Sequence, residues 1–525
     1  MTDTVPGGPA DRDRPTARLL DPTTAAPGAA GEPPSPTLYL HDRLLLTGFP
    51  RSDRELQVGG FAEAMDELGL SFRVTDPSRR RMNAARGSRG LAQTLDAEVL
   101  DSIWVSSVVI ESKDEQANPP DPWTVLQQLR RTAPEVATRV SLEHVVRPAG
   151  YWGGIGYWGG IGYWGGIAGY WSGAGYWGGI GGYWGGAAAL HEYDMPGRGG
   201  RSPVELIIAD PALSAGRGPT RPPVVALLDT IVQDHPWFAD GSRMTQLRVS
   251  GGQLVPASPA PAEPNNPLTG ERRPYEGHGT FIAGLIRQGC PHAHILSIPV
   301  MDDDGVAEES DILEALTLLL SRHIAGQRGE AGQVIDVLSL SLGYYAEDST
   351  YLSSPTKLLL DRFAEHGVVV VAGVGNDATE RPFVPAALAA PVPSSTRATT
   401  RPPVSSVGAL NPEGTSVALF SNALAHVSAL RPGVALVSTV PTVNGSGQPS
   451  VSTGDGKGLP RRTMDPDDYT SGFAVWSGTS FSTPVLAAEL AAELAGAGSL
   501  ADTDDAAMRR RGIKALRACL GRNPR

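Results

Sequence analysis

Ser477-Gly-Thr-Ser-Phe-Ser-Thr-Pro484 is a turn of small residues that opens an apolar helical stretch, and it carries Ser480. Two earlier blocks have the same character. Gly277-His-Gly-Thr-Phe-Ile-Ala-Gly284 opens another apolar stretch with His278, and Val225-Ala-Leu-Leu-Asp-Thr230 is an apolar run that ends at Asp229. The chain therefore presents an acid, a base and a nucleophile in that order. A carboxylate, a histidine with a pKa of about 6.5 and a serine hydroxyl are the groups that nucleophilic attack on a carbonyl requires.

This order resembles that of the subtilisin-like (S8) serine peptidases and differs from the orders of chymotrypsin-like peptidases and α/β-hydrolases. The resemblance covers roughly residues 222 to 498. It implies that Asp229 orients the imidazole, His278 takes and returns the proton, and Ser480 attacks the peptide carbonyl. Each residue taken singly could be an ordinary turn or cap residue, whereas the three blocks in order indicate catalysis.

A fourth block supports the same chemistry. Gly367-Val-Val-Val-Val-Ala-Gly-Val-Gly-Asn376 is typical of a buried strand that ends in a glycine-rich turn. The resemblance implies that Asn376 donates a side-chain N–H to the developing oxyanion, a contact worth about 3 kcal/mol. A plain turn asparagine is the alternative. The resemblance also implies that an extended peptide substrate is bound by Ser341, Leu342, Gly343, Gly373 and Gly375.

Two positions depart from the family pattern. Phe281 follows Gly-His-Gly-Thr where histidine is usual, and Val485 follows the proline of the serine block where histidine is again usual. Neither position carries the chemistry, so the assignment of the triad does not depend on them.

The composition limits the class of protein. The 525 residues leave room for two or three domains, and 63 Gly with 45 Pro indicate long loops. The net charge of −12 disfavours nucleic acid as a partner. Cys290 and Cys519 cannot form a disulfide framework, and we expect both to act as small apolar side chains.

Neither a secretory signal nor a membrane span is visible. Met1-Thr-Asp-Thr-Val-Pro-Gly-Gly-Pro9 has no basic and apolar regions, and no run of about 18 apolar residues occurs. We therefore expect a cytoplasmic protein without a membrane partner, with export by another route as the alternative. No cofactor is expected. Asp302, Asp303 and Asp304 could suggest calcium, but without spaced oxygen ligands they favour a solvated turn.

Residues 37–149 predict a small α+β domain. Strands over 39–49, 71–75, 102–111 and 136–146 alternate with helices over 61–70 and 122–131, the second helix following Asp121 as its cap. This βαββαβ order is the ferredoxin-like split unit. In pattern and position it is similar to the inhibitory propeptide that precedes many subtilisin-like catalytic domains, and an unrelated small domain is the alternative.

Two segments at this domain are predicted to lack regular structure. Residues 1–36 contain almost no large apolar side chains, which predicts disorder. Residues 78–89 carry five arginines. We interpret them as a solvated loop, with an internal processing site as the alternative.

Between Gly150 and Gly186 the chain repeats Tyr-Trp-Gly-Gly-Ile-Gly with small variations, and its Tyr-Trp pairs begin at 151, 157, 163, 170, 176 and 183. Spacings of six and seven fit neither a strand nor a helix, and the units are too short for a solenoid. Three interpretations stay open. The repeat is a low-complexity linker, a self-presented peptide that is cut in cis at several equivalent places, or a precursor peptide whose rings a partner enzyme crosslinks.

The remaining chain predicts an α/β enzyme. Residues 203–209 look like a strand leading into it, and the strand-like runs 224–228, 295–300, 334–340, 368–372 and 404–409 alternate with the helical runs 278–289, 310–325, 354–366 and 480–495. This alternation predicts a subtilisin-like parallel sheet with helices on both faces and ligands at the carboxyl ends of the strands. We expect a peptidase domain over 200–498, surface insertions at 378–403 and 441–472, and a basic C-terminal helix within 499–525.

The sequence thus predicts a serine endopeptidase that hydrolyses peptide bonds through an acyl-enzyme and is made as an autoprocessed zymogen. Its expected partner is a peptide or protein substrate, which could be its own linker. One alternative is a processing protein fused to a modified Tyr-Trp-Gly repeat peptide, whose partner would be the modifying enzyme. The other is a non-catalytic protein-binding module on a peptidase fold.

Overall fold

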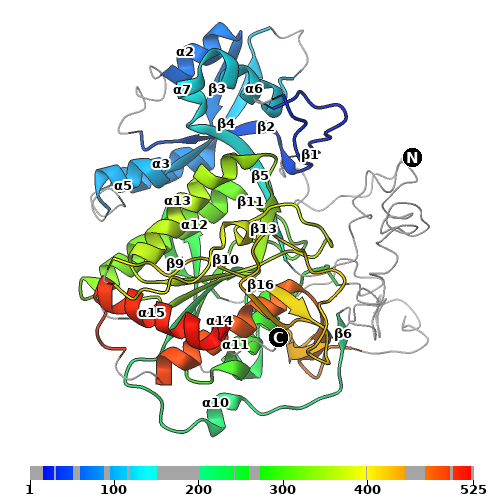
Figure 1. Cartoon of the computed structure of the whole chain (residues 1–525), viewed down its shortest axis with the longest axis vertical. Helices are drawn as coiled ribbons and strands as arrows, with labels where there is room; N and C mark the ends of the chain where they lie inside the picture. Colours follow the sequence, from blue (N-terminus) through cyan, green and yellow to red (C-terminus); the bar gives the residue numbers. More distant parts are fainter. Residues whose placement is uncertain are drawn as a thin grey trace, which may run out of the picture.

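The computed structural model describes residues 16–28, 31–50, 60–87, 91, 95–114, 119–149, 201–239, 241, 243–258, 272–330, 332–397, 399–443, 468–496 and 500–521. The first 15 residues, the Tyr-Trp repeat of 150–186 and most of the insertion expected at 441–472 lie outside these residues, and so do the predictions made for them. We refer to residues 16–149 as the N-terminal unit and to residues 201–521 as the C-terminal unit (Figure 1).

An eight-stranded sheet forms the centre of the C-terminal unit. Its order is β17-β16-β14-β12-β7-β10-β8-β9, and all neighbours are parallel except β8 and β9. The strands are β7 (Val224–Asp229), β8 (Met244–Ser250), β9 (Gln253–Pro256), β10 (His294–Pro299), β12 (Val337–Leu340), β14 (Val369–Gly373), β16 (Ser405–Leu410) and β17 (Ala429–Pro432). The parallel sheet expected from the sequence is confirmed.

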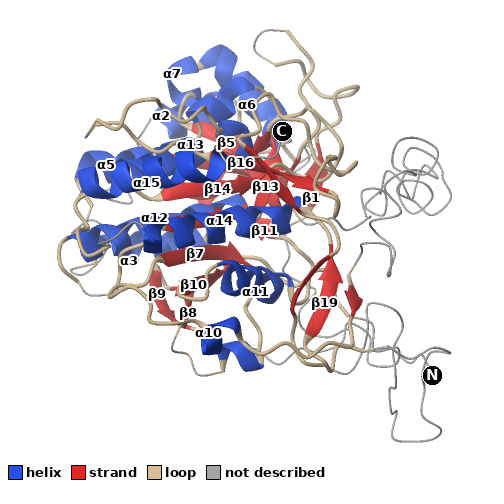
Figure 2. Cartoon of the chain, turned by 60° about the horizontal axis from the view of Figure 1, so that its bottom comes forward, coloured by secondary structure: helices blue, strands red, loops and turns tan. Residues whose placement is uncertain are grey.

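Helices cover both faces of this sheet (Figure 2). They are α11 (His278–Gly289), α12 (Glu309–Gln327), α13 (Pro355–Glu365), α14 (Thr479–Gly496) and α15 (Asp505–Leu520). Helices α12 and α13 pack with Ala226 and Leu338, while α11, α14 and α15 pack with the alternate residues Val225 and Val337. Burial on both sides explains why these strands are continuous apolar runs. No helix within the described residues is long and apolar enough to cross a membrane.

The N-terminal unit contains an antiparallel sheet in the order β5-β2-β4-β3. Its elements are β2 (Leu38–Thr47), α2 (Gly60–Glu67), β3 (Leu70–Val74), β4 (Val105–Ser112), α6 (Pro122–Thr132) and β5 (Val140–Pro148). Asp121 caps α6, since its side chain accepts the N–H of Thr124 at 3.1 Å. The order is compatible with the expected βαββαβ unit.

The N-terminal unit is more structured than the sequence indicated. Part of the arginine-rich stretch forms α3 (Asp76–Arg86), which Thr75 caps by accepting the N–H of Ser78, so the expected loop was wrong. Residues 16–28 include β1 (Ala17–Leu19), which pairs with β2, so their expected disorder was wrong too. Short helices, α5 (Ala97–Ile103) and α7 (Pro134–Ala137), replace the predicted starts of β4 and β5.

Two predictions for the C-terminal unit also need correction. The strand expected at 203–209 is only β6 (Ser202–Pro203), and Ile207 is 94% exposed. The expected surface insertion at 378–403 contains a buried part, β15 (Phe383–Val384) and η4 (Ala386–Leu388). The basic C-terminal helix expected within 499–525 is present as α15, and its Leu516 is buried in the core that it shares with α14.

The smaller elements complete the described C-terminal unit. They are α10 (Pro211–Ser214), η2 (Pro236–Phe238), β11 (Ala307–Glu308), β13 (Leu342–Tyr345), η3 (Ser349–Ser353), β18 (Leu436–Thr439) and β19 (Phe473–Trp476). Strands β18, β19 and β6 form a small antiparallel sheet.

Strand β5 joins the two units. It leaves the N-terminal sheet and pairs antiparallel with β11 and with β13, so that Val146 lies opposite Ala307 and Arg147 opposite Gly343 (Figure 1). The apolar cores also merge, because the N-terminal sheet packs on α12 and helix α5 packs on α13. The last residues of the N-terminal unit therefore run along the carboxyl edge of the parallel sheet, where a ligand is expected.

Candidate active site

Asp229 and His278 are joined by a hydrogen bond in the interior. Asp229 ends β7 and His278 begins α11, and His278 Nδ1 lies 2.6 Å from Asp229 Oδ1. The same carboxylate oxygen accepts the backbone N–H of Thr230 at 2.7 Å. Both side chains are fully buried, and His278 Nε2 has no hydrogen-bond partner among the described residues. The carboxylate fixes the ring so that Nε2 can accept a proton.

Glycines explain how His278 reaches this position. Gly277 caps α11 with a φ of +81°, a left-handed conformation that glycine adopts without strain. A Cβ on Gly279 would collide with the backbone oxygen of Thr230. The imidazole is then surrounded by the rings of Phe481, Trp476 and Tyr275, whose centroids lie 5.2, 5.4 and 5.6 Å away. These rings keep water from the ring and strengthen the electrostatic interactions around it.

Ser480 is the second residue of α14 and is fully buried. Its Oγ donates to the carbonyl of Ser341 at 3.1 Å, while Ser341 Oγ donates to the carbonyl of Ser480 at 2.8 Å. Pro484 lies four residues further along the helix and has no N–H for that carbonyl. The proline therefore leaves the carbonyl of Ser480 free to bind the chain at the end of β12.

Three donors converge on the carbonyl oxygen of Ala149. They are the N–H of Ser480 at 2.7 Å, the hydroxyl of Thr479 at 3.0 Å, and the side-chain amide of Asn376. Asn376 is oriented by Thr479, whose N–H donates to Asn376 Oδ1 at 2.9 Å. Donors around a carbonyl oxygen beside a serine are the arrangement that stabilises an oxyanion.

The residues predicted to bind substrate surround the same segment. The carbonyl of Ser341 accepts the N–H of Ala149 at 2.7 Å, and Leu342 and Gly343 pair with Pro148 and Arg147. Gly373 lies beneath Ala149, since a Cβ on Gly373 would be 3.0 Å from the Cβ of Ala149. Gly375 contacts Asn422 and Phe383.

The sequence matches the model of the subtilase family (Peptidase_S8) over residues 220–516, more than half of the chain. The chain belongs to the subtilase family. Subtilisin E from Bacillus subtilis is 28% identical over 230 residues, which are 41% of this chain and 48% of subtilisin E. This subtilase therefore spans about half the length of that relative.

Solved structures of related proteins also resemble this subtilase. The prenylagaramide maturation protease PagA is 23% identical with a TM-score of 0.31, over 59% of this chain and 97% of PagA. Fervidolysin from Fervidobacterium pennivorans, described as a keratinolytic enzyme related to subtilisin, is 17% identical with a TM-score of 0.43, over 87% of this chain and 55% of fervidolysin.

The N-terminal unit of this subtilase is held by a buried histidine. His144 of β5 lies between two carboxylates of the C-terminal unit, with Nδ1 2.6 Å from Glu309 and Nε2 2.9 Å from Glu347. Its ring stacks on Tyr344 at 4.0 Å. Burial lowers the pKa of His144, but the two carboxylates outweigh this effect and raise it to about 10. His144 is therefore a buried cation, paired on both sides.

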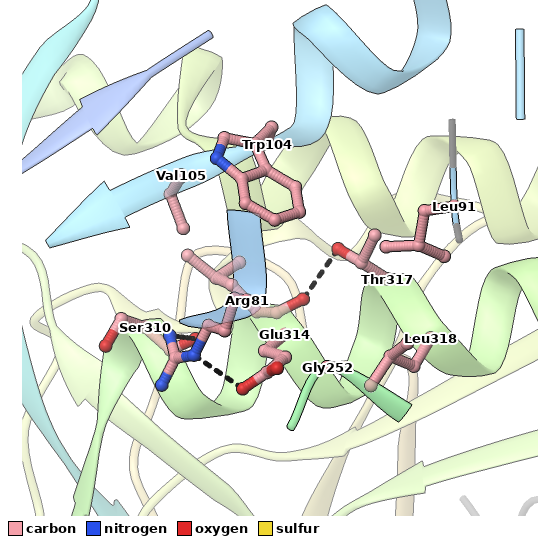
Figure 3. Close-up of a pocket in the computed structure, with 10 residues that line it drawn as sticks. Arg81, Leu91, Trp104, Val105, Gly252, Ser310, Glu314, Thr317 and Leu318 are labelled. Atoms are coloured by element: carbon pink, nitrogen blue, oxygen red, sulfur yellow. Dashed lines mark hydrogen bonds and ion pairs between the residues drawn. The ribbon is translucent and has the colours of Figure 1, made fainter. Parts of the chain in front are cut away.

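Arginines of the N-terminal unit add further ion pairs to this interface. Each places a cation of the N-terminal unit on a carboxylate of the C-terminal unit: Arg43 with Glu308, Arg81 with Asp311 and Glu314, and Arg130 with Asp348. Figure 3 shows Arg81 of α3 directed at Glu314 of α12 beside a cavity of about 20 Å³. The interface is thus complementary in charge, which favours a defined docked position.

Some residues of the site were missed by the sequence interpretation. Thr479 was quoted within the serine block, yet its hydroxyl was given no role. Ala149 was interpreted only as the end of a domain. The start of the repeat at the next residue, Gly150, was the signal that could have marked this bond. His144, Glu309 and Glu347 lie far apart in the chain, so no local pattern could indicate their contact.

The three aspartates considered for calcium form a turn. Asp302 Oδ1 accepts the N–H groups of Asp304 and Val306 at 3.0 and 3.1 Å, and Asp304 pairs with Arg273 at 2.5 Å. Within the described residues no cluster of three or more histidine, cysteine, aspartate or glutamate side chains is arranged to hold a metal.

Proposed function

We propose that this subtilase is a serine endopeptidase that cuts its own chain between Ala149 and Gly150. The observation that supports the proposal most strongly is the position of the Ala149 carbonyl. Its oxygen accepts hydrogen bonds from the N–H of Ser480, the hydroxyl of Thr479 and the amide of Asn376. A peptide bond in this position is oriented for attack by the neighbouring hydroxyl, which removes most of the entropic cost of the reaction.

The attack begins with a rotation of the Ser480 hydroxyl. In the structure Ser480 Oγ donates to Ser341, whereas His278 Nε2 is free to accept. Turning Oγ towards Nε2 transfers its proton to His278, and Oγ bonds to the carbonyl carbon of Ala149. The negative charge that forms on the carbonyl oxygen is stabilised by the three donors, and the imidazolium by Asp229.

Collapse of this intermediate breaks the bond between the carbonyl carbon and the nitrogen of Gly150. His278 returns its proton to the leaving amine, and an ester between Ala149 and Ser480 remains. Water then enters, gives a proton to His278 and attacks the ester, which restores the Ser480 hydroxyl and leaves Ala149 as a free carboxylate. One water molecule is consumed for each bond.

The proposal makes the N-terminal unit an inhibitor after the cut. Residues 145–148 lie between β11 and β13 as the middle strand of three, so that the backbone itself occupies the substrate position. The ion pairs of His144, Arg43, Arg81 and Arg130 do not depend on the cut bond. We infer that the N-terminal unit stays bound and blocks the site until it is released.

A fluorophosphonate probe tests the proposed activity. The probe should label the wild-type enzyme at Ser480 once the N-terminal unit has been released, and peptide mapping should locate the label there. Labelling at any residue other than Ser480, or no labelling of an enzyme that hydrolyses peptides, would overturn the assignment.

Replacing Asn376 by alanine should slow processing without preventing folding. The variant loses one of the three donors to the oxyanion, which costs about 3 kcal/mol of transition-state stabilisation, or roughly 10²- to 10³-fold in rate. The rate of appearance of the N-terminal fragment measures this effect. Asn411→Ala, in an exposed turn after β16, is the control and should process at the wild-type rate. Equal rates for the two variants would contradict the role given to Asn376.

The affinity of the cut N-terminal unit should fall as the pH rises. His144 has a pKa of about 10 when docked, against about 6.5 when free. The contribution of His144 to the binding free energy is therefore fully present below about pH 6.5 and is lost as the pH rises through 10. Over this range the affinity falls by up to about tenfold per pH unit. Burial raises the pKa of Glu143 and of Glu314 to about 7, which acts in the same direction.

Titration of the complex between pH 6 and 10, followed by size-exclusion chromatography or fluorescence, measures this dependence. In a His144→Asn variant the affinity should no longer fall between about pH 8 and 10, and it should still fall near pH 7. Affinity that increases with pH in the wild-type protein would contradict the assignment of charge to His144.

A further inference from the structure

The side chain of Ala149 is buried, and we call the space that it fills the Ala149 pocket. Ala149 is 1% exposed, and its Cβ lies directly on Gly373. Two segments form its walls. One begins with Ser341 and the other ends with Asn376, and both also bind the backbone of Ala149. The depth of the pocket decides which residue can precede a cut bond.

The ring of Phe383 lies beside Gly343 and Gly375, one glycine from each of these segments. A Cβ on Gly343 would lie 2.6 Å from Cε1 of Phe383, and a Cβ on Gly375 would lie 3.2 Å from its Cδ1. The ring is 4% exposed and is fixed by the pairing of β15 with β13, which places Tyr345 opposite it, with ring centroids 5.1 Å apart. Two glycines therefore make room for one aromatic ring beside the segments that hold the backbone of Ala149.

We propose that Phe383 restricts the enzyme to alanine-sized residues before the cut bond, and that its substrates include two further Ala–Gly bonds in its own linker. The inference rests on the proposed function and adds the substrate class. Ala149-Gly-Tyr-Trp152 has two copies later in the chain, Ala168-Gly-Tyr-Trp171 and Ala174-Gly-Tyr-Trp177. The remaining Tyr-Trp pairs follow Ile-Gly or Gly-Gly.

The chain returns to the site after the linker. The guanidinium of Arg201 lies 5.1 Å from the ring centroid of Trp476, and Trp476 contacts His278. Arg201 also donates to the carbonyls of Glu276 and Arg273 at 2.7 and 3.0 Å. A linker that has been cut after Ala149 is thus still attached beside the triad, and a chain of the 25 residues between Gly175 and Arg201 reaches up to about 85 Å.

Each further cut follows the same chemistry. Ser480 Oγ bonds to the carbonyl carbon of Ala168 or Ala174, the bond to the following glycine nitrogen breaks, and the amine leaves with the proton from His278. One water molecule then hydrolyses each ester. Cuts at all three Ala–Gly bonds release residues 150–168 and 169–174 as peptides and leave Gly175 as the new N-terminus.

Mass spectrometry of the full wild-type chain, incubated after purification, tests the inference. We expect peptides that end at Ala168 and Ala174, at amounts about 10- to 100-fold above any that end at Ile155 or Ile161. The double variant Ala168→Ile/Ala174→Ile should keep the cut after Ala149 and lose the other two. Ile155→Ala makes a fourth Ala-Gly-Tyr-Trp stretch and should add a cut after position 155.

The pocket is tested separately with synthetic peptides of the form Val-Arg-Pro-Xaa-Gly-Tyr-Trp. The wild-type enzyme should prefer alanine over isoleucine or phenylalanine at Xaa, and Phe383→Leu or Phe383→Ala should reduce that preference. Cuts after isoleucine that match those after alanine, or a cut after Ala149 with none at 168 or 174, would overturn the inference and leave the proposed function intact. An enzyme with no Ser480-dependent cleavage of any peptide would overturn the proposed function itself.

Discussion

Replacing Ser480 by alanine should leave a single uncut chain. The wild-type protein should yield an N-terminal fragment that ends at Ala149, whereas Ser480→Ala lacks the oxygen that forms the ester in the proposed mechanism and should lose about 10⁶-fold in rate. The loss should not come from unfolding. The substitution removes one hydroxyl, whose hydrogen bond goes to the carbonyl of Ser341, and it keeps the N–H that binds Ala149. Electrophoresis and intact mass over time measure the result.

A matched control lies two residues further along the same helix. Ser482 is fully buried, and its hydroxyl donates to the carbonyl of Thr479 at 3.1 Å, so Ser482→Ala removes a comparable group from the same turn. Ser482→Ala should still be cut after Ala149. Processing by Ser480→Ala at a rate near that of the wild-type protein would remove Ser480 from the mechanism.

Replacing His144 by leucine should release the N-terminal unit after processing. Glu309 and Glu347 would then be two buried carboxylates that face each other without a cation. Breaking a buried ion pair by removal of one partner costs about 3–5 kcal/mol, which corresponds to roughly 10²- to 10⁴-fold weaker binding. Peptidase activity should therefore appear earlier than in the wild-type protein. The fraction of the N-terminal fragment that co-elutes with the C-terminal unit measures the change.

Two variants separate this effect from a general loss of stability. Arg139→Ala removes an ion pair with Asp101 whose side chains are 55% and 50% exposed, so it should change the affinity by less than about 1 kcal/mol. The triple variant His144→Gln/Glu309→Gln/Glu347→Gln replaces the buried charges with neutral groups and should recover part of the affinity. An N-terminal unit that binds equally well with leucine at position 144 would contradict the role of the buried cation.

Local sequence patterns predicted the parts of the fold that depend on short-range chemistry. The apolar run that ends at Asp229 is a strand buried on both sides, and the small-residue turns at His278 and Ser480 do open helices. The resemblance to the subtilisin-like peptidases also grouped Ser341 and Asn376, which bind the N–H and the carbonyl of Ala149. These residues lie at strand ends or helix starts, which hydrophobic pattern and glycine positions reveal.

Other features were missed, one despite a local signal and one because it depends on contacts between distant segments. Arg81 was assigned to a solvated loop because it lies in a run of charge, although Thr75 and Pro77 are a helix-start signal that was available. Phe383 was assigned to a surface insertion because the surrounding stretch is rich in proline and serine. Its burial follows from the pairing of β15 with β13, which no local pattern specifies.

The central claim is that Ser480 cuts the bond after Ala149, and the mass of the N-terminal fragment tests it most directly. The wild-type protein should give a fragment whose C-terminal residue is Ala149, and the same preparation of Ser480→Ala should give none. This readout does not depend on later trimming of the linker. A fragment that ends at another residue, or one that ends at Ala149 in both preparations, would contradict the account.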